Sequence, residues 1–232
     1  MGNPHHYSIE LPRRCMTVID NLWTTAEKIY GEDRPDIGPL TSTFLLSMSM
    51  PILSIPLERI ERQIDRPAGT GYADDTFLNP AVVNAFENVI RRGQLGDAPF
   101  YKGGAWRFHS IKKGPFLNIA EGIPEPVADR LSSDEAVEAA RSMPAQQWIS
   151  IIRNAMAHGG IAYLDEHGRS SYGTPVKMYA FVSGKYGKPK CQHADAECRY
   201  GLGMLEGLNI LRVSEMDYRD FLHDWVKWLE VK

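Results

Sequence analysis

The 232-residue chain has few cysteines, no excess of positive charge and no long run of purely apolar residues. Its three cysteines, Cys15, Cys191 and Cys198, cannot all pair within one chain. Such a sparse, odd number is expected in a reducing cytoplasm rather than in a disulfide-stabilised secreted protein. Lys and Arg number 26 against 29 Asp and Glu, so the formal net charge is −3. Because no global positive field exists, any binding of nucleic acid must rest on a local patch.

A signal peptide and a membrane span are also not expected. The first residues lack the apolar core that a signal peptide needs. Residues 37–57 carry no charge over a length that a bilayer requires, but three prolines and six Ser or Thr interrupt them. Lipid offers no partner for the backbone groups that prolines release. We therefore expect a buried core helix with a bent exit here, and no membrane partner.

The composition, 43% hydrophobic and 24% charged, is that of an ordinary globular protein. The length suits a single domain, which we place at residues 1–232. Apolar residues recur at helical spacing over residues 12–30 and 40–63. Asn79-Pro80, the capping-box pattern Ser132 to Glu135, Pro144 and Ser214 each mark the start of a further helix.

Residues 94–130 are rich in glycine and proline and are expected to form loops and short extended pieces. After the pair Gly159-Gly160, the stretches IAYL, VKMYAFVS and LNILRVS are typical of strands. The predicted fold class is mainly α (α+β), a helical bundle with a small antiparallel β-hairpin element before the C-terminal helix.

The segment that points most directly to chemistry is residues 146–160, QQWISIIRNAMAHGG. On a helical wheel its apolar residues share one arc, which must face the core. Arg153 lies past one edge of that arc, and Asn154 and His158 lie past the other, one turn apart. A lane of small or polar residues, Gln146, Ser150 and Ala157, separates them. Because Arg153 and His158 diverge by about 140°, two copies meeting at a two-fold axis would bind one phosphate more easily than a single helix.

Arg153-Asn154-Ala-Met-Ala-His158 resembles the motif of the HEPN superfamily, an arginine followed by a polar residue and, four to six residues beyond the arginine, a histidine. The specific resemblance covers about fifteen residues. The long apolar helix and the hairpin after AHGG also look like those of a bacterial or plasmid-borne branch. The resemblance implies a helical bundle that dimerises so that both motifs line one cleft. It also implies metal-independent endoribonuclease activity in toxin–antitoxin, phage-defence or RNA-processing systems, without a cofactor or metal.

The residue types suit that chemistry. Cleavage of RNA without metal uses the 2′-hydroxyl as nucleophile and needs a base, an acid and positive charge near the phosphate. His158 is the natural proton carrier, Arg153 braces phosphate oxygens, and Asn154 orients the imidazole or holds the phosphate. Toxins of the superfamily that a nucleotidyltransferase silences carry a tyrosine two residues after the histidine. That position is Gly160 here, so this mode of control is not expected, and the alternative is an antitoxin or defence-system partner that acts in another way.

Two weaker patterns leave alternatives open. Cys191, His193 and Cys198 offer three zinc ligands where a structural site needs four, so an incidental grouping is the stronger interpretation. Basic residues between positions 91 and 113 are interleaved with four aromatic residues, Phe100, Tyr101, Trp106 and Phe108. Such mixing can bind a single strand by stacking and charge, or it can be a solvated loop whose aromatic residues enter the core.

The sequence thus favours a cytoplasmic homodimer that acts on RNA as a metal-independent endoribonuclease through Arg153, Asn154 and His158. The alternative is a non-catalytic module of the same fold that binds RNA or a nucleotide.

Overall fold

The computed structural model describes residues 4–29, 39–65, 78–112, 118–170, 173–187 and 205–230. Within these ranges the α-helices are α1 (Tyr7–Lys28), α2 (Thr41–Asp65), α3 (Pro80–Phe86), α4 (Glu125–Leu131), α5 (Asp134–Arg141), α6 (Ala145–His158) and α7 (Glu215–Leu229). The strands are β1 (Arg107–Ile111), β2 (Ile161–Leu164), β3 (Met178–Tyr186) and β4 (Leu205–Ser214). Three short helical turns are η1 (Glu87–Arg91), which is a π-helix, η2 (Leu95–Asp97) and η3 (Ile119–Glu121).

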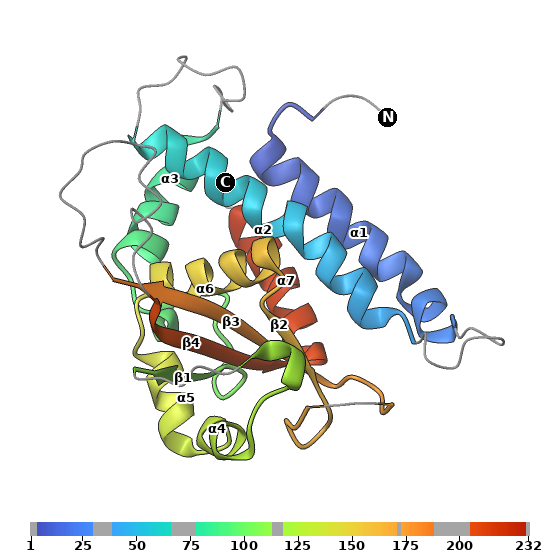
Figure 1. Cartoon of the computed structure of the whole chain (residues 1–232). Coiled ribbons are helices and arrows are strands. Elements are labelled where there is room, and N and C mark those ends of the chain that lie inside the picture. Colours follow the sequence, from blue (N-terminus) through green and yellow to red (C-terminus); the bar gives the residue numbers. More distant parts are fainter. Residues whose placement is uncertain are drawn as a thin grey trace, which may run out of the picture.

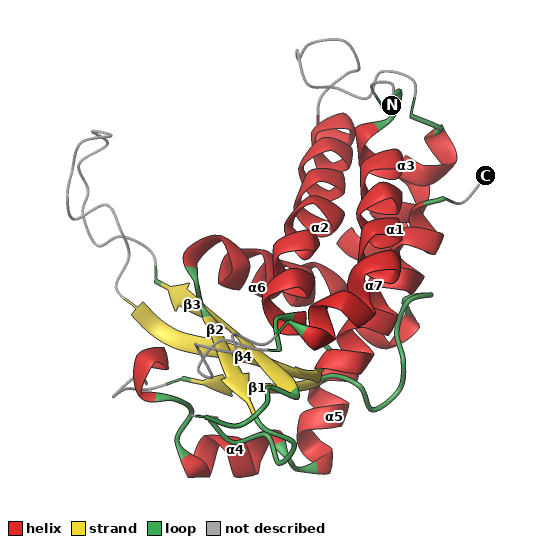
Figure 2. Ribbon diagram, turned by 90° about the vertical axis from the view of Figure 1, so that its right-hand side faces the viewer, coloured by secondary structure: helices red, strands yellow, loops and turns green. Residues whose placement is uncertain are grey.

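The strands form one antiparallel sheet in the order β1-β4-β3-β2, enclosed by helices (Figure 1). Helices α6 and α7 cover one face, and the α1–α2 pair packs beyond them. On the other side of the sheet lie α4 and, beside the edge strand β1, α5 (Figure 2). This arrangement belongs to the expected α+β class. Among the described helices, none combines the length and apolar character that crossing a bilayer requires.

The residues of β3 alternate between two apolar clusters, as the period of a strand dictates. Tyr179 and Phe181 enter the larger cluster under α6 and α7, whereas Ala180 and Val182 face the smaller one beside α4. Aromatic rings fill the centre of the larger cluster, where the Trp148 ring of α6 packs edge-on against Trp106 with 5.1 Å between centroids. Rings of this size contribute most of the apolar area that a core buries, so α6 is held firmly against the sheet.

The sheet is larger than the expected hairpin because residues 94–130 are not all irregular. They contain β1, which pairs with β4 from Arg107 opposite Arg212 to Ile111 opposite Leu208. They also contain most of α4, which begins after Pro124 with a second proline in its first turn. The capping-box prediction was one residue early: the N-cap of α5 is Ser133, whose hydroxyl accepts from the backbone N–H of Ala136.

The first of the two N-terminal helices begins earlier than expected, and the second matches the helix predicted over residues 40–63. α1 begins at Tyr7, five residues before the expected start, because the Glu10 carboxylate accepts from the backbone N–H groups of His5 and His6. α2 runs from Thr41 to Asp65 as one helix that contains Pro51 and Pro56. The expected N-caps at Asn79 and Ser214 are confirmed, with side chains that accept from the backbone N–H groups of Ala81 and Asp217.

Candidate functional site

Helix α6 carries the three predicted site residues and is fixed in place at both ends. Pro144 precedes its first turn, and its C-cap is Gly159, which takes the left-handed conformation with φ 70°. The next residue, Gly160, returns its N–H to the carbonyl of Ala155 at 2.7 Å and leads into β2. The expected core arc is confirmed for Trp148, Ile149, Ile152 and Ala155. Met156 is only half-buried and Gly159, also expected in this arc, is exposed, whereas Ile151 is buried as well. The buried arc is wider than expected because α6 lies between α2 and the sheet.

Arg153 lies on the side of α6 that faces α2. Its guanidinium is 3.2 Å from a carboxylate oxygen of Glu58 and 3.8 Å from one of Glu61. The Arg153 side chain is 32% exposed, and that of Glu61 is 23% exposed. Burial raises the pKa of Glu61, and the positive charges of Arg153 and Arg91 act in the opposite direction. Within this chain, Arg153 therefore pairs with one carboxylate that is half-buried, Glu61, and with one that is exposed, Glu58.

Asn154, the next residue, lies on the opposite side and contacts the sheet. Its amide nitrogen donates to the hydroxyl of Ser183 on β3 at 3.3 Å. Ser183 is 7% exposed and follows Phe181 on the face of β3 that meets α6. The amide thus anchors the C-terminal half of α6 to a buried hydroxyl of the sheet.

His158 is the last residue of α6 and is exposed. To the residues that the structure describes, its imidazole makes no hydrogen bond and no ion pair. Both ring nitrogens are therefore accessible to a ligand. The wheel prediction was that Arg153 points away from Asn154 and His158, and the different neighbours of Arg153 and Asn154 agree with it. One chain does not bring the three groups to a single point.

A cleft that the sequence did not predict lies beside the N-terminal half of α6; it combines apolar surface with polar and charged side chains, and we call it the polar cleft after the latter. It has a volume of about 800 Å³ between α6 and the adjoining ends of β1, β3 and β4. Gln147 of α6, Ser110 of β1 and Asn209 of β4 contribute to its lining. Two signals pointed to it: Gln147 lies two turns before Asn154 on the same side of the helix, and LNILRVS reads as a strand with an inward-facing asparagine.

The interleaved basic and aromatic segment is mainly structural. Phe100 and Trp106 are each 1% exposed and belong to the core, which favours the second of the two interpretations. Lys102 is paired with Asp217 and Asp220 of α7. Phe108, by contrast, is half-buried and lines the polar cleft.

Cys191, His193 and Cys198 lie outside the described residues. In the part of the chain that is described, no three His, Cys, Asp or Glu side chains are close enough together to hold a metal ion.

Taken together, α6 presents an accessible imidazole, an amide anchored on the sheet, an arginine anchored on α2 and an adjoining polar cleft. Such groups can exchange protons, donate hydrogen bonds to phosphate and neutralise its charge. Comparison of the chain with protein-family models, with curated proteins and with solved structures found no match.

Proposed function

We propose that the protein is a metal-independent endoribonuclease of the HEPN type, with an active site completed across a homodimer interface. The observation that carries the proposal is the position of Arg153-Asn154-x-x-x-His158 on the last two turns of α6, where His158 is exposed and has no partner among the described residues. A toxin or phage-defence role in the cytoplasm is the context that this resemblance favours.

The reaction needs no group beyond those on α6. A histidine takes the proton of the RNA 2′-hydroxyl, whose oxygen attacks the adjacent phosphorus. The bond from phosphorus to the 5′-oxygen breaks, a second imidazole donates a proton to that oxygen, and a 2′,3′-cyclic phosphate remains. General acid–base catalysis of this kind contributes typically ~10²–10⁴-fold. The Arg153 guanidinium would neutralise the extra charge on the phosphorus oxygens.

A second protomer supplies what one chain lacks. Between its two anchored sides α6 presents a strip of uncharged residues, in which Gln146 and Ala157 are exposed and Ser150 is half-buried. Two such strips can approach closely about a two-fold axis, which would place the histidine of one copy near the arginine of the other. A dimer would also provide the second imidazole that the acid step requires.

Control by transfer of a nucleotide onto a tyrosine two residues after the histidine is not part of the proposal. Position 160 is glycine, and a Cβ there would collide with the backbone carbonyl oxygen of Val182 on β3. An antitoxin or defence partner would have to act in another way, for example by covering His158.

The second candidate is a non-catalytic module that binds RNA or a nucleotide. The pairing of Arg153 with Glu58 and Glu61 favours it. These carboxylates already neutralise the guanidinium, which catalysis would need to stabilise negative charge on the phosphorus oxygens.

Incubation of a mixed RNA pool with the protein in EDTA distinguishes the two candidates. We expect fragments with cyclic phosphate ends from the wild type, a loss of ~10²–10⁴-fold in rate for His158→Ala, and a marked loss for Arg153→Ala. His167→Ala is the matched control, since His167 is exposed in the loop after β2 and should leave the rate unchanged. Absence of cleavage by folded, dimeric protein would favour the binding module. Equal cleavage by the His158 variant would refute the assigned site.

A further inference from the structure

The polar cleft marks the place where the apolar core beneath α6 ends. Ser110, Asn209 and Ser183 occupy matching positions on β1, β4 and β3, so they form a polar row across three strands. The Ser110 hydroxyl and the side-chain oxygen of Asn209 are hydrogen-bonded at 3.1 Å. One step inward, the same face carries Phe108, Leu211 and Phe181. Ser110 and Asn209 of this row line the floor of the cleft, whereas Ser183 is buried beneath Asn154.

Gly207 allows the end of β1 to lie close to β4 at the edge of the cleft. A Cβ at position 207 would lie 2.7 Å from the carbonyl oxygen of Ile111 and 3.8 Å from the Cα of Lys112. The missing side chain lets the end of β1 approach β4 and brings Lys112 to the rim of the cleft. Lys112 thus depends on a glycine of the neighbouring strand for its position.

Two lysines place positive charge at the rim of the cleft. Lys112 and Lys185 both line the cleft and are exposed, and neither makes a hydrogen bond or ion pair with the residues that the structure describes. The one carboxylate among the described lining residues, Glu206, lies against the backbone of Gly187. The cleft can therefore accept an anion without first losing an internal salt bridge of either lysine.

These groups match the parts of a nucleotide. Lysines at a rim contact phosphate, while the amides of Gln147 and Asn209 can read the edge of a base. The Ser110 hydroxyl can bond a ribose 2′-hydroxyl, and the half-buried Phe108 ring offers a surface for stacking. The volume of about 800 Å³ lies in the range of sites for small organic ligands.

Gln147 lines the cleft from the side of α6 that also carries Asn154 and His158. Gln147, Asn154 and His158 lie within about 40° of one another around the helix. α6 runs antiparallel to β3, since Gly160 bonds Val182, Asn154 bonds Ser183, and Gln147 lines the same cleft as Lys185. Gln147 and His158 are eleven residues apart, about 16 Å along the axis. One extended strand can therefore occupy the cleft and reach the imidazole.

From this arrangement we infer that the polar cleft binds single-stranded RNA, holding nucleotides a short distance from the phosphate presented to His158. The identity of the ligand rests on the proposed function. The binding itself does not require that the protein cleaves RNA.

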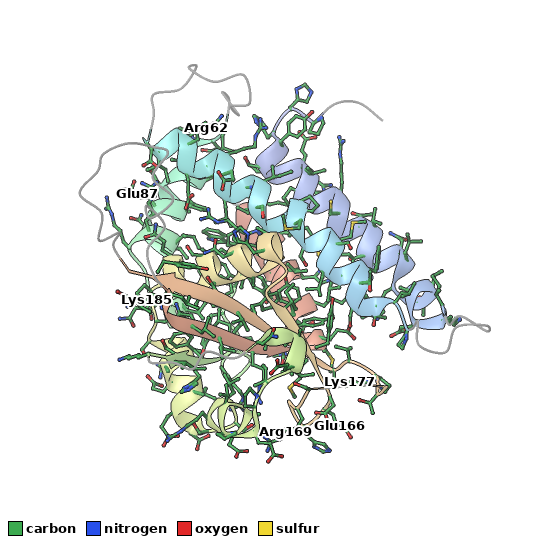
Figure 3. All side chains as sticks on the ribbon, in the orientation of Figure 1. Arg62, Glu87, Glu166, Arg169, Lys177 and Lys185 are labelled. Carbon is green, nitrogen blue, oxygen red and sulfur yellow. The ribbon has the colours of Figure 1, made fainter. Side chains whose placement is uncertain are left out.

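The test measures the affinity of a short fluorescent single-stranded RNA by anisotropy, in EDTA and with His158→Ala in every variant so that the probe stays intact. Lys112→Ala with Lys185→Ala should weaken binding about tenfold at low salt and reduce the slope of log affinity against log salt by about 1.4, the value for two phosphate contacts on a single strand. The control pair is Lys177→Ala with Lys227→Ala, which removes the same charge elsewhere. Lys177 and Lys185 lie at opposite ends of β3 (Figure 3), and we expect little change in affinity from the control.

The outcomes separate this inference from the proposed function. Lysine-dependent binding without cleavage by the wild type would support the cleft and refute the nuclease. If the wild type cleaves RNA but both double-lysine variants bind it with equal affinity, the proposed nuclease activity would be retained and the proposal that the cleft binds RNA would be refuted. Absence of RNA binding in all variants would also overturn the cleft. Circular dichroism of each variant would show that a loss of affinity is not a loss of fold.

Discussion

The guanidinium of Arg153 and the carboxylate of Glu58 form an ion pair of 3.2 Å between α6 and α2. The adjacent residue, Asn154, is bonded to Ser183 on the opposite side of the helix. Under the proposed function, Arg153 must contact a phosphate or the second protomer. The Glu58 carboxylate therefore competes directly with RNA for the arginine.

Replacement of Glu58 by Gln should strengthen RNA binding. The substitution removes a negative charge from Arg153 and keeps the size of the side chain. Exposed ion pairs contribute about 0.2–1 kcal/mol, so the affinity should rise between about 1.4-fold and 5-fold. Glu87→Gln is the control, because Glu87 is paired with Arg92 and not with Arg153. Anisotropy titration of labelled RNA measures both, and an unchanged affinity in Glu58→Gln would mean that Arg153 does not contact RNA.

Replacement of Arg153 by Met should lower stability more at pH 7 than at pH 4. Burial raises the pKa of Glu61 above its ordinary value of 4.5, so its contribution to stability is full below that pH and is lost as the pH rises through the raised pKa. Arg153 limits this loss by stabilising the ionised form. Without it, the extra loss at pH 7 should be about 1 kcal/mol, whereas at pH 4 it should be small.

Urea unfolding at the two pH values checks this prediction. Arg92→Met serves as the control, since the Arg92 side chain is 70% exposed whereas that of Arg153 is 32% exposed. An equal loss at both pH values in Arg153→Met would show that Glu61 is not the group stabilised by the arginine.

The two glycines after His158 should respond differently to alanine. At Gly159 a Cβ has free space, but the positive φ costs about 1–2 kcal/mol. At Gly160 the Cβ would collide with the carbonyl oxygen of Val182 on a central strand, so the loss of stability should exceed about 2 kcal/mol. Thermal unfolding of the two variants gives the order. A Gly160→Ala protein as stable as the wild type would mean that β3 can move away from α6.

Tyr179→Phe should destabilise the protein by about 1.5–3 kcal/mol, the range for hydrogen bonds to charged groups. The Tyr179 hydroxyl donates to a Glu215 carboxylate oxygen at 2.6 Å, and Ser42 of α2 donates to the same oxygen at 2.9 Å. Burial and the Glu215 charge raise the pKa of Tyr179, so it remains a donor. Denaturant unfolding compares it with Tyr163→Phe, whose exposed hydroxyl should contribute little. Similar losses in the two variants would contradict the prediction.

Local signals in the sequence predicted the ends of several elements. Asn79 and Ser214 accept backbone N–H groups at the helix starts that they marked, and Gly159 ends α6 in the left-handed conformation. These features depend on residues within one turn, which a single sequence contains. The position of β1 was missed because its pairing depends on β4, about a hundred residues later.

For the candidate site, too, the sequence predicted what depends on local helical geometry and did not predict contacts with distant segments. The wheel separated Arg153 from Asn154 and His158 correctly, since that depends only on helical geometry. It could not identify Glu58 as the partner of Arg153 or Ser183 as that of Asn154, because these contacts arise from the packing of distant segments. Pro126, in the first turn of α4, was a usable signal for a helix start within residues 94–130.

Two neighbouring residues of α6 are tied to different layers of the molecule, Arg153 to α2 and Asn154 to β3. Because these two contacts lie at neighbouring positions on different sides of α6, together they fix the rotation of the helix about its own axis. His158 follows Asn154 by one turn, so the direction of its imidazole depends on contacts that it does not make. Loss of either contact would therefore change the direction of the His158 imidazole, although neither contact involves His158.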